Sequence, residues 1–126
     1  METLTIGAAI IEYKYRYLVL KRATHKENPG MWEFPGGKHQ EGESLQNCVE
    51  REIFEELGVR ATAAKLLGSS ERIVGDKIIQ IFGLQTVLEQ EPKEFRDHSE
   101  MRWVSFGELS SLNMTLPDLG LVHALQ

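Results

Sequence analysis

Residues 37–59 read GKHQEGESLQNCVEREIFEELGV, and this stretch decides how the rest of the chain is interpreted. It follows the spacing G-x5-E-x7-R-E-(aliphatic)-x-E-E-x-G-(aliphatic). The positions that fill this pattern are Gly37, Glu43, Arg51, Glu52, Ile53, Glu55, Glu56, Gly58 and Val59. At typical residue frequencies, a chance match at a chosen start is well below about one in 10⁸. The stretch therefore indicates where the chemistry of the protein lies.

A helix is predicted between Ser44 and Gly58. Ser44 can cap the N-terminus, Gly58 suits the left-handed position that ends a helix, and no Gly or Pro lies between them. At roughly 100° per residue, one face of this helix is apolar. That face consists of Leu45, Val49, Ile53 and Leu57. The single cysteine, Cys48, permits no disulfide within the chain and is expected to be a buried, unreactive thiol.

Glu52, Glu55 and Glu56 occupy an adjoining arc of the same helix, at i,i+3 and i,i+4 spacing. Such carboxylates repel one another, and the repulsion grows when they are partly buried. A hard divalent cation removes the conflict, because carboxylate oxygens are the ligands that Mg²⁺ and Mn²⁺ prefer. Arg51 borders the arc and can neutralise Glu43 or a helix carboxylate. An isolated pair of glutamates is usually a solvated surface, but the complete pattern favours a metal-binding helix.

The pattern resembles the Nudix box, and every specified position is filled as that family requires. The segment MWEFPGGKHQEGES is similar to the MutT-type subgroup, whose members hydrolyse nucleoside triphosphates to a monophosphate and pyrophosphate. HSEMRWVSFGEL resembles the later family segment that brings one more acidic residue to the metals, and LPDLGLVHAL resembles the piece that closes the base pocket. The resemblance implies one Nudix domain over residues 1–126, with a mixed β-sheet between α-helices (an α/β/α sandwich).

The resemblance also implies roles for individual residues. The expected ligands of Mg²⁺, or of Mn²⁺ in its place, are Glu52, Glu55, Glu56, a main-chain carbonyl of Gly36 or Gly37, and Glu100. Arg51 would pair with Glu43 and brace the loop against the helix. Water would attack one phosphorus of the triphosphate in line. The candidates for accepting its proton are Glu52 and Glu100, with Asp97 a weaker one.

Substrate contacts are expected from residues around the box. Arg22 and Lys38 are placed to meet phosphate oxygens, although both could be ordinary exposed cations. By resemblance, Leu4, Ile6 and Phe34 would line the base pocket, and plain core packing is the alternative for each of them.

Asp118 is the residue that bears most directly on substrate choice. The best-known oxidised-guanine hydrolases of bacterial MutT type carry Asn at this position, and Asn both donates and accepts hydrogen bonds. An ionised Asp only accepts and favours the cytosine amino group, whereas a protonated Asp can donate to a guanine oxygen. Relatives that hydrolyse cytidine triphosphates also resemble this LPD segment. Asp118 could instead cap the last helix.

Composition limits the partners. The chain has 126 residues, enough for one domain with one core, and its 41% hydrophobic and 26% charged residues are ordinary for a soluble globular protein. The net charge of −5 opposes binding to a nucleic-acid polymer, so a small nucleotide is the expected partner. The sequence shows no signal peptide and no transmembrane run. A cytoplasmic monomer or homodimer without membrane contact is expected.

Further elements are predicted around the box, and their order indicates an α+β fold with helices packed on the faces of a mixed sheet. Strands are predicted at 6–11 and 17–22 (a hairpin), 31–34 (broken at Pro35-Gly36-Gly37), 63–74, 77–88 and 101–106. A mobile charged loop is predicted at 89–100, a short helix at 108–112, and a C-terminal helix opened by Pro117.

Alternatives to a nucleoside triphosphate hydrolase remain open at this stage. The box is compatible with another nucleoside diphosphate derivative, such as a nucleotide sugar, a dinucleotide or a capped RNA end. A binding module that has lost catalysis typically lacks a box glutamate, and none is missing here. An isomerase of isoprenoid diphosphates would need insertions for which the chain has no room.

Overall fold

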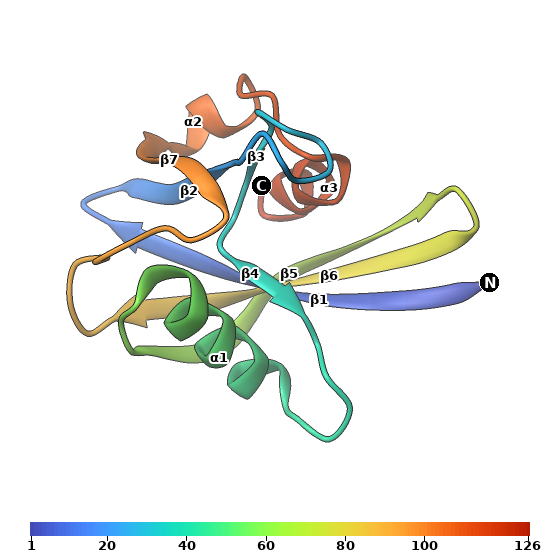
Figure 1. Ribbon diagram of the computed structural model, residues 1–126, viewed down its shortest axis with the longest axis horizontal. Coiled ribbons are helices and arrows are strands. Elements are labelled where there is room, and N and C mark those ends of the chain that lie inside the picture. Colours follow the sequence, from blue (N-terminus) through green and yellow to red (C-terminus); the bar gives the residue numbers. More distant parts are fainter.

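The computed structural model describes all residues, 1–126, and contains a sheet of seven strands (Figure 1). The strands are β1 (Glu2–Tyr13), β2 (Arg16–Arg22), β3 (Trp32–Glu33), β4 (Gly36–Lys38), β5 (Ala61–Val74), β6 (Lys77–Leu88) and β7 (His98–Ser105). The helices are α1 (Leu45–Leu57), α2 (Phe106–Leu109) and α3 (Leu116–Ala124). The strand order is β3-β2-β1-β6-β5, and in addition β4 pairs with β1 and β7 pairs with β2.

Strand β1 joins the two parts of the sheet. It pairs in parallel with β6 over most of its length, whereas its antiparallel pairing with β2 is limited to Glu12 with Tyr17 and Tyr13 with Arg16. Beyond this tip, β2 leaves β1 and pairs with β3 and β7. The mixed sheet predicted from the element order is therefore confirmed, and the predicted hairpin is correct only near its turn.

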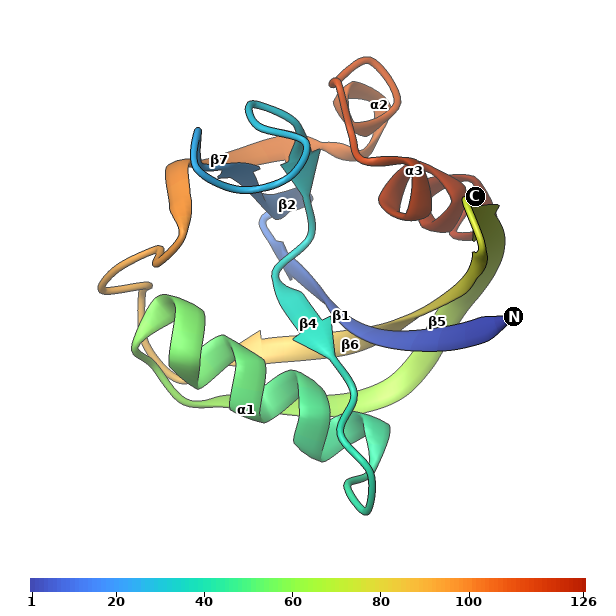
Figure 2. The same ribbon diagram turned by 45° about the vertical axis from the view of Figure 1, so that its right-hand side comes forward.

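Helices cover both faces of the sheet: α1 lies on one face, and α2 and α3 lie on the other (Figures 1 and 2). Successive side chains of β1 point to opposite faces, so Ala8 and Ile10 pack with α2 and α3 while Ala9 and Ile11 pack with α1. The α/β/α sandwich is confirmed. The expected single core is instead two apolar clusters, because the sheet separates them.

Helix α1 begins and ends where its capping residues predict. The Ser44 hydroxyl accepts a hydrogen bond from the Asn47 amide at 3.0 Å, and Gly58 has the left-handed φ of 67° that closes the C-terminus. Cys48 is a buried free thiol, as predicted, and burial raises its pKa to about 11. The apolar side of α1 packs against β1 in the cluster that also contains Ala9 and Ile11.

The predicted break at Pro35-Gly36-Gly37 is wrong for the two glycines, which belong to strand β4. Gly36, Gly37 and Lys38 pair antiparallel with Ala8, Gly7 and Ile6 of β1. A Cβ atom on Gly36, whose φ is 148°, would collide with the carbonyl oxygen of Gly7. The absence of a side chain thus lets this segment approach β1 closely enough to pair with it.

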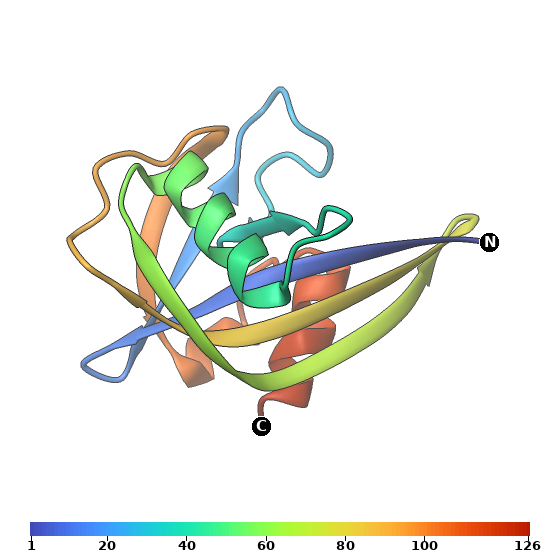
Figure 3. The same ribbon diagram turned by 90° about the horizontal axis from the view of Figure 1, so that it is seen from below.

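The remaining elements differ from prediction mainly at their ends. The predicted strands at 63–74 and 77–88 are confirmed as β5 and β6. The hairpin that joins them extends, with the start of β1, away from the body of the molecule (Figure 3). Helix α2 begins earlier than predicted because Ser105 and Glu108 form a capping box. Strand β7 includes the last residues of the predicted loop. The C-terminal helix opened by Pro117 is confirmed, and no helix is both long and apolar enough to cross a membrane.

Candidate active site

A cleft runs between helix α1, strand β4 and the turn that leads into β7. Figure 2 shows β4 passing beside α1, which brings the glycine strand next to the glutamate arc. The walls of the cleft are formed by Ile6, Ala8, Arg22, Lys26, Glu33, Phe34, Gly36, Gly37, Lys38, Gln40, Arg51, Glu52, Glu55, Glu56, Arg96, Asp97, His98 and Asp118. Residues predicted to serve metal, phosphate and base therefore meet in one concave site.

Glu56 is the most enclosed carboxylate of the arc. It accepts a hydrogen bond from the Gly36 amide at 3.0 Å and forms no ion pair with a protein cation. Burial raises its pKa well above the usual value, and the charges of Glu33, Glu52 and Asp97 raise it further. A carboxylate held in this way is electrostatically uncompensated within the protein.

Glu52 lies against the glycine strand. Its side chain is 17% exposed, and burial raises its pKa, with the charge of Glu55 acting in the same direction. A Cβ atom on Gly37 would overlap the Glu52 carboxylate. Glycine at position 37 therefore creates the space that the Glu52 carboxylate occupies.

Arg51 ties the loop before α1 to the helix. Its Nη2 and Nε atoms donate to the two Glu43 oxygens at 2.8 and 3.1 Å, and Nη2 also donates to the Lys38 carbonyl at 3.0 Å. Nη1 donates to Glu52 at 2.8 Å and to Glu55 at 2.9 Å. The Arg51 guanidinium and the Gln40 amide lower the pKa of Glu43 to about 2. The structure thus shows the pairing of Arg51 with Glu43 that the sequence predicts.

The donor set fits a hard divalent cation in its chemistry. All candidate ligands are oxygens, and the uncompensated Glu56 beside Glu52 leaves negative charge that a cation would neutralise. No three acidic, histidine or cysteine side chains converge closely enough to enclose a metal ion. Instead, Arg51 lies among the carboxylates of Glu43, Glu52 and Glu55.

Of the predicted phosphate-binding residues, Arg22 is paired and Lys38 is free. Nη1 of Arg22 donates to both Glu33 oxygens at 3.0 and 3.1 Å, and its Nε donates to the Glu27 carbonyl. Lys38 is exposed and forms no ion pair. Both line the cleft, so the structure brings them to the site, with the Arg22 charge partly neutralised by Glu33.

Asp118 closes the opposite end of the cleft. It is 7% exposed, its Oδ1 accepts a hydrogen bond from the Phe34 amide at 3.0 Å, and its Oδ2 accepts one from the Thr115 hydroxyl. Burial, followed by the charge of Glu33, raises its pKa to about 7. The N-cap of α3 is Thr115, so Asp118 lies in the first turn and is not the capping residue.

Three predicted site residues lie outside the cleft: Leu4, Glu43 and Glu100. Glu43 is linked to it through its hydrogen bonds to Arg51. Leu4 lies two residues before Ile6 on β1, and Ile6 does line the cleft with Phe34. Glu100 is also outside, and its carboxylate accepts a hydrogen bond from Arg102 at 2.8 Å. The acidic residue that this segment brings to the cleft is Asp97, which directly precedes β7.

Several residues of the cleft are absent from the sequence prediction. Glu33 bonds both Arg22 and His98, and Lys26 lies 3.7 Å from Asp97. The one available signal was the position of Glu33 directly before Phe34 in the EFPGGK segment. Nothing in the sequence indicates that His98 would reach it.

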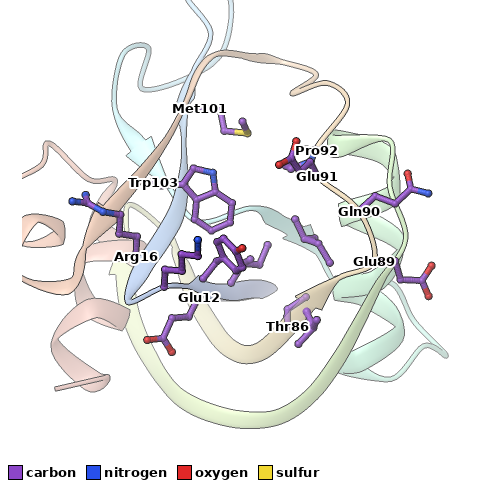
Figure 4. Close-up of a pocket in the computed structure, with 14 residues that line it drawn as sticks. Glu12, Arg16, Thr86, Glu89, Gln90, Glu91, Pro92, Met101 and Trp103 are labelled. Carbon is purple, nitrogen blue, oxygen red and sulfur yellow. The ribbon is translucent and has the colours of Figure 1, made fainter.

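A second cavity lies where strands β1 and β6 end and the following loop begins (Figure 4). Its wall includes Trp103, which packs edge-on against Tyr13 with ring centroids 6.3 Å apart. The charged residues around it are Glu12, Lys14, Arg16, Glu89 and Glu91. None of the α1 glutamates or β4 glycines reaches this cavity, so the residues predicted to bind metal and phosphate lie at the first cleft.

Fold and cleft together define an enzyme of the α/β/α sandwich class with an acidic site opposite a glycine strand. The family described as NUDIX domain matches residues 1–125, and the chain belongs to the Nudix family. It is a hydrolase that acts on phosphoanhydride bonds.

Individual relatives resemble the chain over most of its length. The CTP pyrophosphohydrolase of Escherichia coli (strain K12) is 30% identical over 124 residues, which covers 98% of this chain and 92% of that protein. The putative 8-oxo-dGTP diphosphatase 2 of Mycobacterium tuberculosis (strain H37Rv) is 32% identical over 118 residues, which covers 86% of this chain and 77% of that protein. The solution structure of the E. coli ORF135 protein has a TM-score of 0.82 at 29% identity, covering 98% and 89%. The MutT protein of Methanosarcina mazei Go1 shares the fold, with a TM-score of 0.85 at 24% identity, covering 97% and 91%.

The buried carboxyl of Asp118 predicts that stability in the absence of divalent ions falls as pH rises. Its folded-state pKa of about 7 exceeds the ordinary 3.8, so the native state binds the proton more tightly and loses this stabilisation between about pH 4 and 7. The loss is about 4 kcal/mol at 1.4 kcal/mol per pKa unit. Urea unfolding from pH 4 to 8 should show a flatter dependence in Asp118→Asn than in the wild type. Parallel curves for the two proteins would contradict the raised pKa.

Proposed function

We propose that this protein hydrolyses a nucleoside triphosphate to a nucleoside monophosphate and pyrophosphate, with Mg²⁺ as cofactor and Mn²⁺ as a substitute. The observation that carries the proposal is one cleft that joins the α1 glutamates to the β4 glycines at one end and Asp118 to Phe34 at the other. The named activities of the E. coli and M. tuberculosis relatives support it. A buried free thiol is compatible with the reducing cytoplasm, where we place this activity.

In this proposal, Glu52, Glu55 and Glu56 hold the cations together with a main-chain carbonyl of Gly36 or Gly37. Bound cations would stabilise the charge that develops on the phosphate oxygens during displacement. Arg51 keeps the arc and the Glu43 loop in register through its five-donor fork. The protein groups thereby supply a preformed anionic surface on which cations and triphosphate assemble.

Three further groups act on the substrate directly in the proposed mechanism. Lys38, which is free of ion pairs, binds phosphate oxygens, and Arg22 joins it from the opposite wall. A carboxylate oxygen of Asp97 accepts a proton from the attacking water. The sequence offers Glu52, Glu100 and, more weakly, Asp97 for this role. We assign it to Asp97 because Glu52 holds the cations in this proposal, and the Glu100 carboxylate is bonded to Arg102 outside the cleft that Asp97 lines.

Asp118 sets the class of base. Each carboxylate oxygen has a second lone pair free after its bond to Phe34 or Thr115, so an ionised Asp118 accepts from the amino group of cytosine. With a pKa of about 7, the protonated form is also present near neutral pH and can donate to a guanine oxygen. We therefore propose cytosine and oxidised-guanine triphosphates as the substrate class, which makes the protein a sanitiser of the nucleotide pool.

The test is a turnover panel with 8-oxo-dGTP, CTP, dCTP, 5-methyl-dCTP, dATP and a nucleotide sugar in Mg²⁺, scored for pyrophosphate against phosphate. One cytosine or oxidised-guanine triphosphate should be cleaved far faster than the rest, with release of pyrophosphate and complete loss of turnover in EDTA. Preferred cleavage of the nucleotide sugar would move the substrate to another nucleoside diphosphate derivative. Turnover of nothing in the panel would overturn the proposed function.

The fit of Gly37 against Glu52 gives a prediction for the metal end. Gly37→Ala should lower kcat/KM about 10- to 100-fold, because the new methyl group displaces the Glu52 carboxylate. The matched control is Gly107→Ala, since a Cβ there meets no atom within 4 Å. Steady-state kinetics and thermal melts of both variants measure the effect. Equal activity in the two variants would show that the Glu52 position is unimportant for turnover.

A further inference from the structure

His98 closes the turn that carries Asp97 into the cleft. Its backbone amide donates to the Phe95 carbonyl at 3.2 Å, and its Nδ1 lies 2.8 Å from the Arg96 carbonyl oxygen. Between these bonds, Asp97 adopts a left-handed φ of 61°, which a residue with a side chain adopts at an energetic cost. The His98 side chain thus closes a turn whose central residue has a left-handed backbone conformation.

The second nitrogen of the His98 ring contacts Glu33, another residue of the cleft. Nε2 lies 2.8 Å from Glu33 Oε2, and the His98 side chain is 4% exposed. Glu33 belongs to β3, directly before Phe34, and it also holds Arg22. One buried ring therefore connects the Asp97 turn to the strand that leads into the base end of the site.

The two bonds of the His98 ring act together. Nδ1 faces a carbonyl oxygen and Nε2 faces a carboxylate oxygen, so each ring nitrogen has one partner within hydrogen-bond distance. Glu33 lies between the His98 ring and the Arg22 guanidinium and contacts both. This arrangement fixes the ring at both nitrogens and leaves it no alternative orientation with the same partners.

Main-chain bonds complete the frame around the turn. The Arg96 amide donates to the Glu56 carbonyl at 2.9 Å, and the Ala23 amide donates to the Asp97 carbonyl at 3.2 Å. The basic side chains nearest to the Asp97 carboxylate are both exposed, with His25 at 3.5 Å and Lys26 at 3.7 Å. Such exposed pairs contribute little to orientation, so the backbone turn determines where the Asp97 carboxylate lies.

We infer that His98 is a positioning residue for Asp97: its bonds to Arg96 and Glu33 hold the Asp97 carboxylate at the cleft opposite the α1 glutamates. The inference rests on the proposed function, in which Asp97 accepts the proton of the attacking water. A group displaced by about 1 Å from its productive geometry loses on the order of 100-fold in rate. His98 therefore acts on the chemical step and leaves substrate binding to Arg22, Lys38 and Asp118.

The test uses two variants that each keep one of the two hydrogen bonds of the His98 ring. The amide nitrogen of Asn lies at the same number of bonds from Cα as Nδ1 of His, and that of Gln matches Nε2. His98→Asn thus retains the bond to Arg96 and loses the bond to Glu33. His98→Gln retains the bond to Glu33 and loses the bond to Arg96. Both should lower kcat about 10- to 100-fold with KM within about twofold of the wild type. The control is His123→Gln, an exposed position on α3, which should leave both constants unchanged.

A double variant separates positioning from general stabilisation. If His98 acts through Asp97, then His98→Gln combined with Asp97→Asn should be no slower than Asp97→Asn alone. Effects that multiply in the double variant would overturn the inference. An unchanged kcat in both single variants would overturn it as well.

A measurement independent of turnover keeps the inference distinguishable from the proposed function. The backbone amide order parameter of Asp97 should be near 0.85 in the wild type and below about 0.6 in His98→Gln. Equal order parameters would overturn the positioning role even if activity fell. If the wild type cleaves no substrate in the panel, the proposed function fails while this NMR comparison still decides whether His98 fixes the turn.

Discussion

Glu56→Gln is expected to lower kcat at least about 1,000-fold at saturating Mg²⁺ while the fold stays intact. The amide keeps the size of the side chain and an oxygen for the Gly36 amide, but it removes the negative charge that a divalent cation needs. A 1,000-fold loss corresponds to about 4 kcal/mol of transition-state stabilisation, a reasonable share for a ligand of the catalytic cation. The rate of pyrophosphate release from a single nucleoside triphosphate, compared between the two proteins, measures this loss of kcat.

Stability measurements distinguish loss of the ligand from loss of the fold. Without divalent ions, the neutral amide replaces a buried carboxyl group. Ionisation of that group destabilises the native state increasingly as pH rises, because its pKa is raised in the folded protein. Glu56→Gln should therefore unfold at a urea concentration no lower than the wild type near neutral pH. Added Mg²⁺ should stabilise the wild type more than the variant.

The control for this substitution is Glu41→Gln, which removes the same charge from an exposed position that does not line the cleft. It should retain wild-type kcat. Activity of Glu56→Gln within about tenfold of the wild type would mean that the buried carboxylate is structural and that the α1 glutamates do not bind the catalytic cation in the proposed way.

Local chemistry made helix α1 predictable. The Ser44 hydroxyl caps the start of the helix, and the backbone freedom of glycine lets Gly58 end it. Both properties belong to the residue itself, so the sequence and the structure agree at both ends. The pairing of Arg51 with Glu43 was predictable for a related reason: it depends on spacing along a helix and a short loop. In these parts of the site, the residues in contact are close together in the sequence, so their spacing predicts the contacts.

Strand β4 was beyond such reasoning because its formation depends on a distant partner. Two glycines carry no strand propensity, and they pair only because Gly7 and Ala8 of β1 lie opposite them. The parallel pairing of β1 with β6, which separates the two apolar clusters, likewise joins segments far apart in the sequence. Patterns of single segments do not specify which segments meet.

The choice between Asp97 and Glu100 shows the same limit at the site. Both belong to the acidic stretch RDHSE, and composition gives no reason to prefer either. The bonds that hold this turn join distant segments: the His98 ring contacts Glu33, a residue 65 positions earlier, and the Arg96 amide donates to the Glu56 carbonyl. The pairing of Arg22 with Glu33 was also hidden, since an arginine in sequence does not disclose which carboxylate neutralises it.

Asp118→Asn is expected to change the ranking of bases by about 10- to 100-fold in the ratio of kcat/KM for 8-oxo-dGTP to that for CTP. Asn offers an N–H donor at all pH values, whereas Asp donates only when protonated. A base edge that faces a buried group of the wrong polarity loses about 1–3 kcal/mol, which corresponds to this ratio. The variant should favour the oxidised guanine because its carbonyl oxygen gains a permanent donor.

The protein environment allows this exchange without a change of fold. The Asn oxygen can accept from the Phe34 amide, and the Thr115 hydroxyl can rotate to accept from the new amide nitrogen. The matched comparison is the pH dependence of the ratio. In the wild type, preference for CTP should rise as pH passes through about 7 and Asp118 ionises, and in the variant the ratio should be constant. A ranking that is the same in both proteins at every pH would leave Asp118 a structural residue that joins α3 to Phe34.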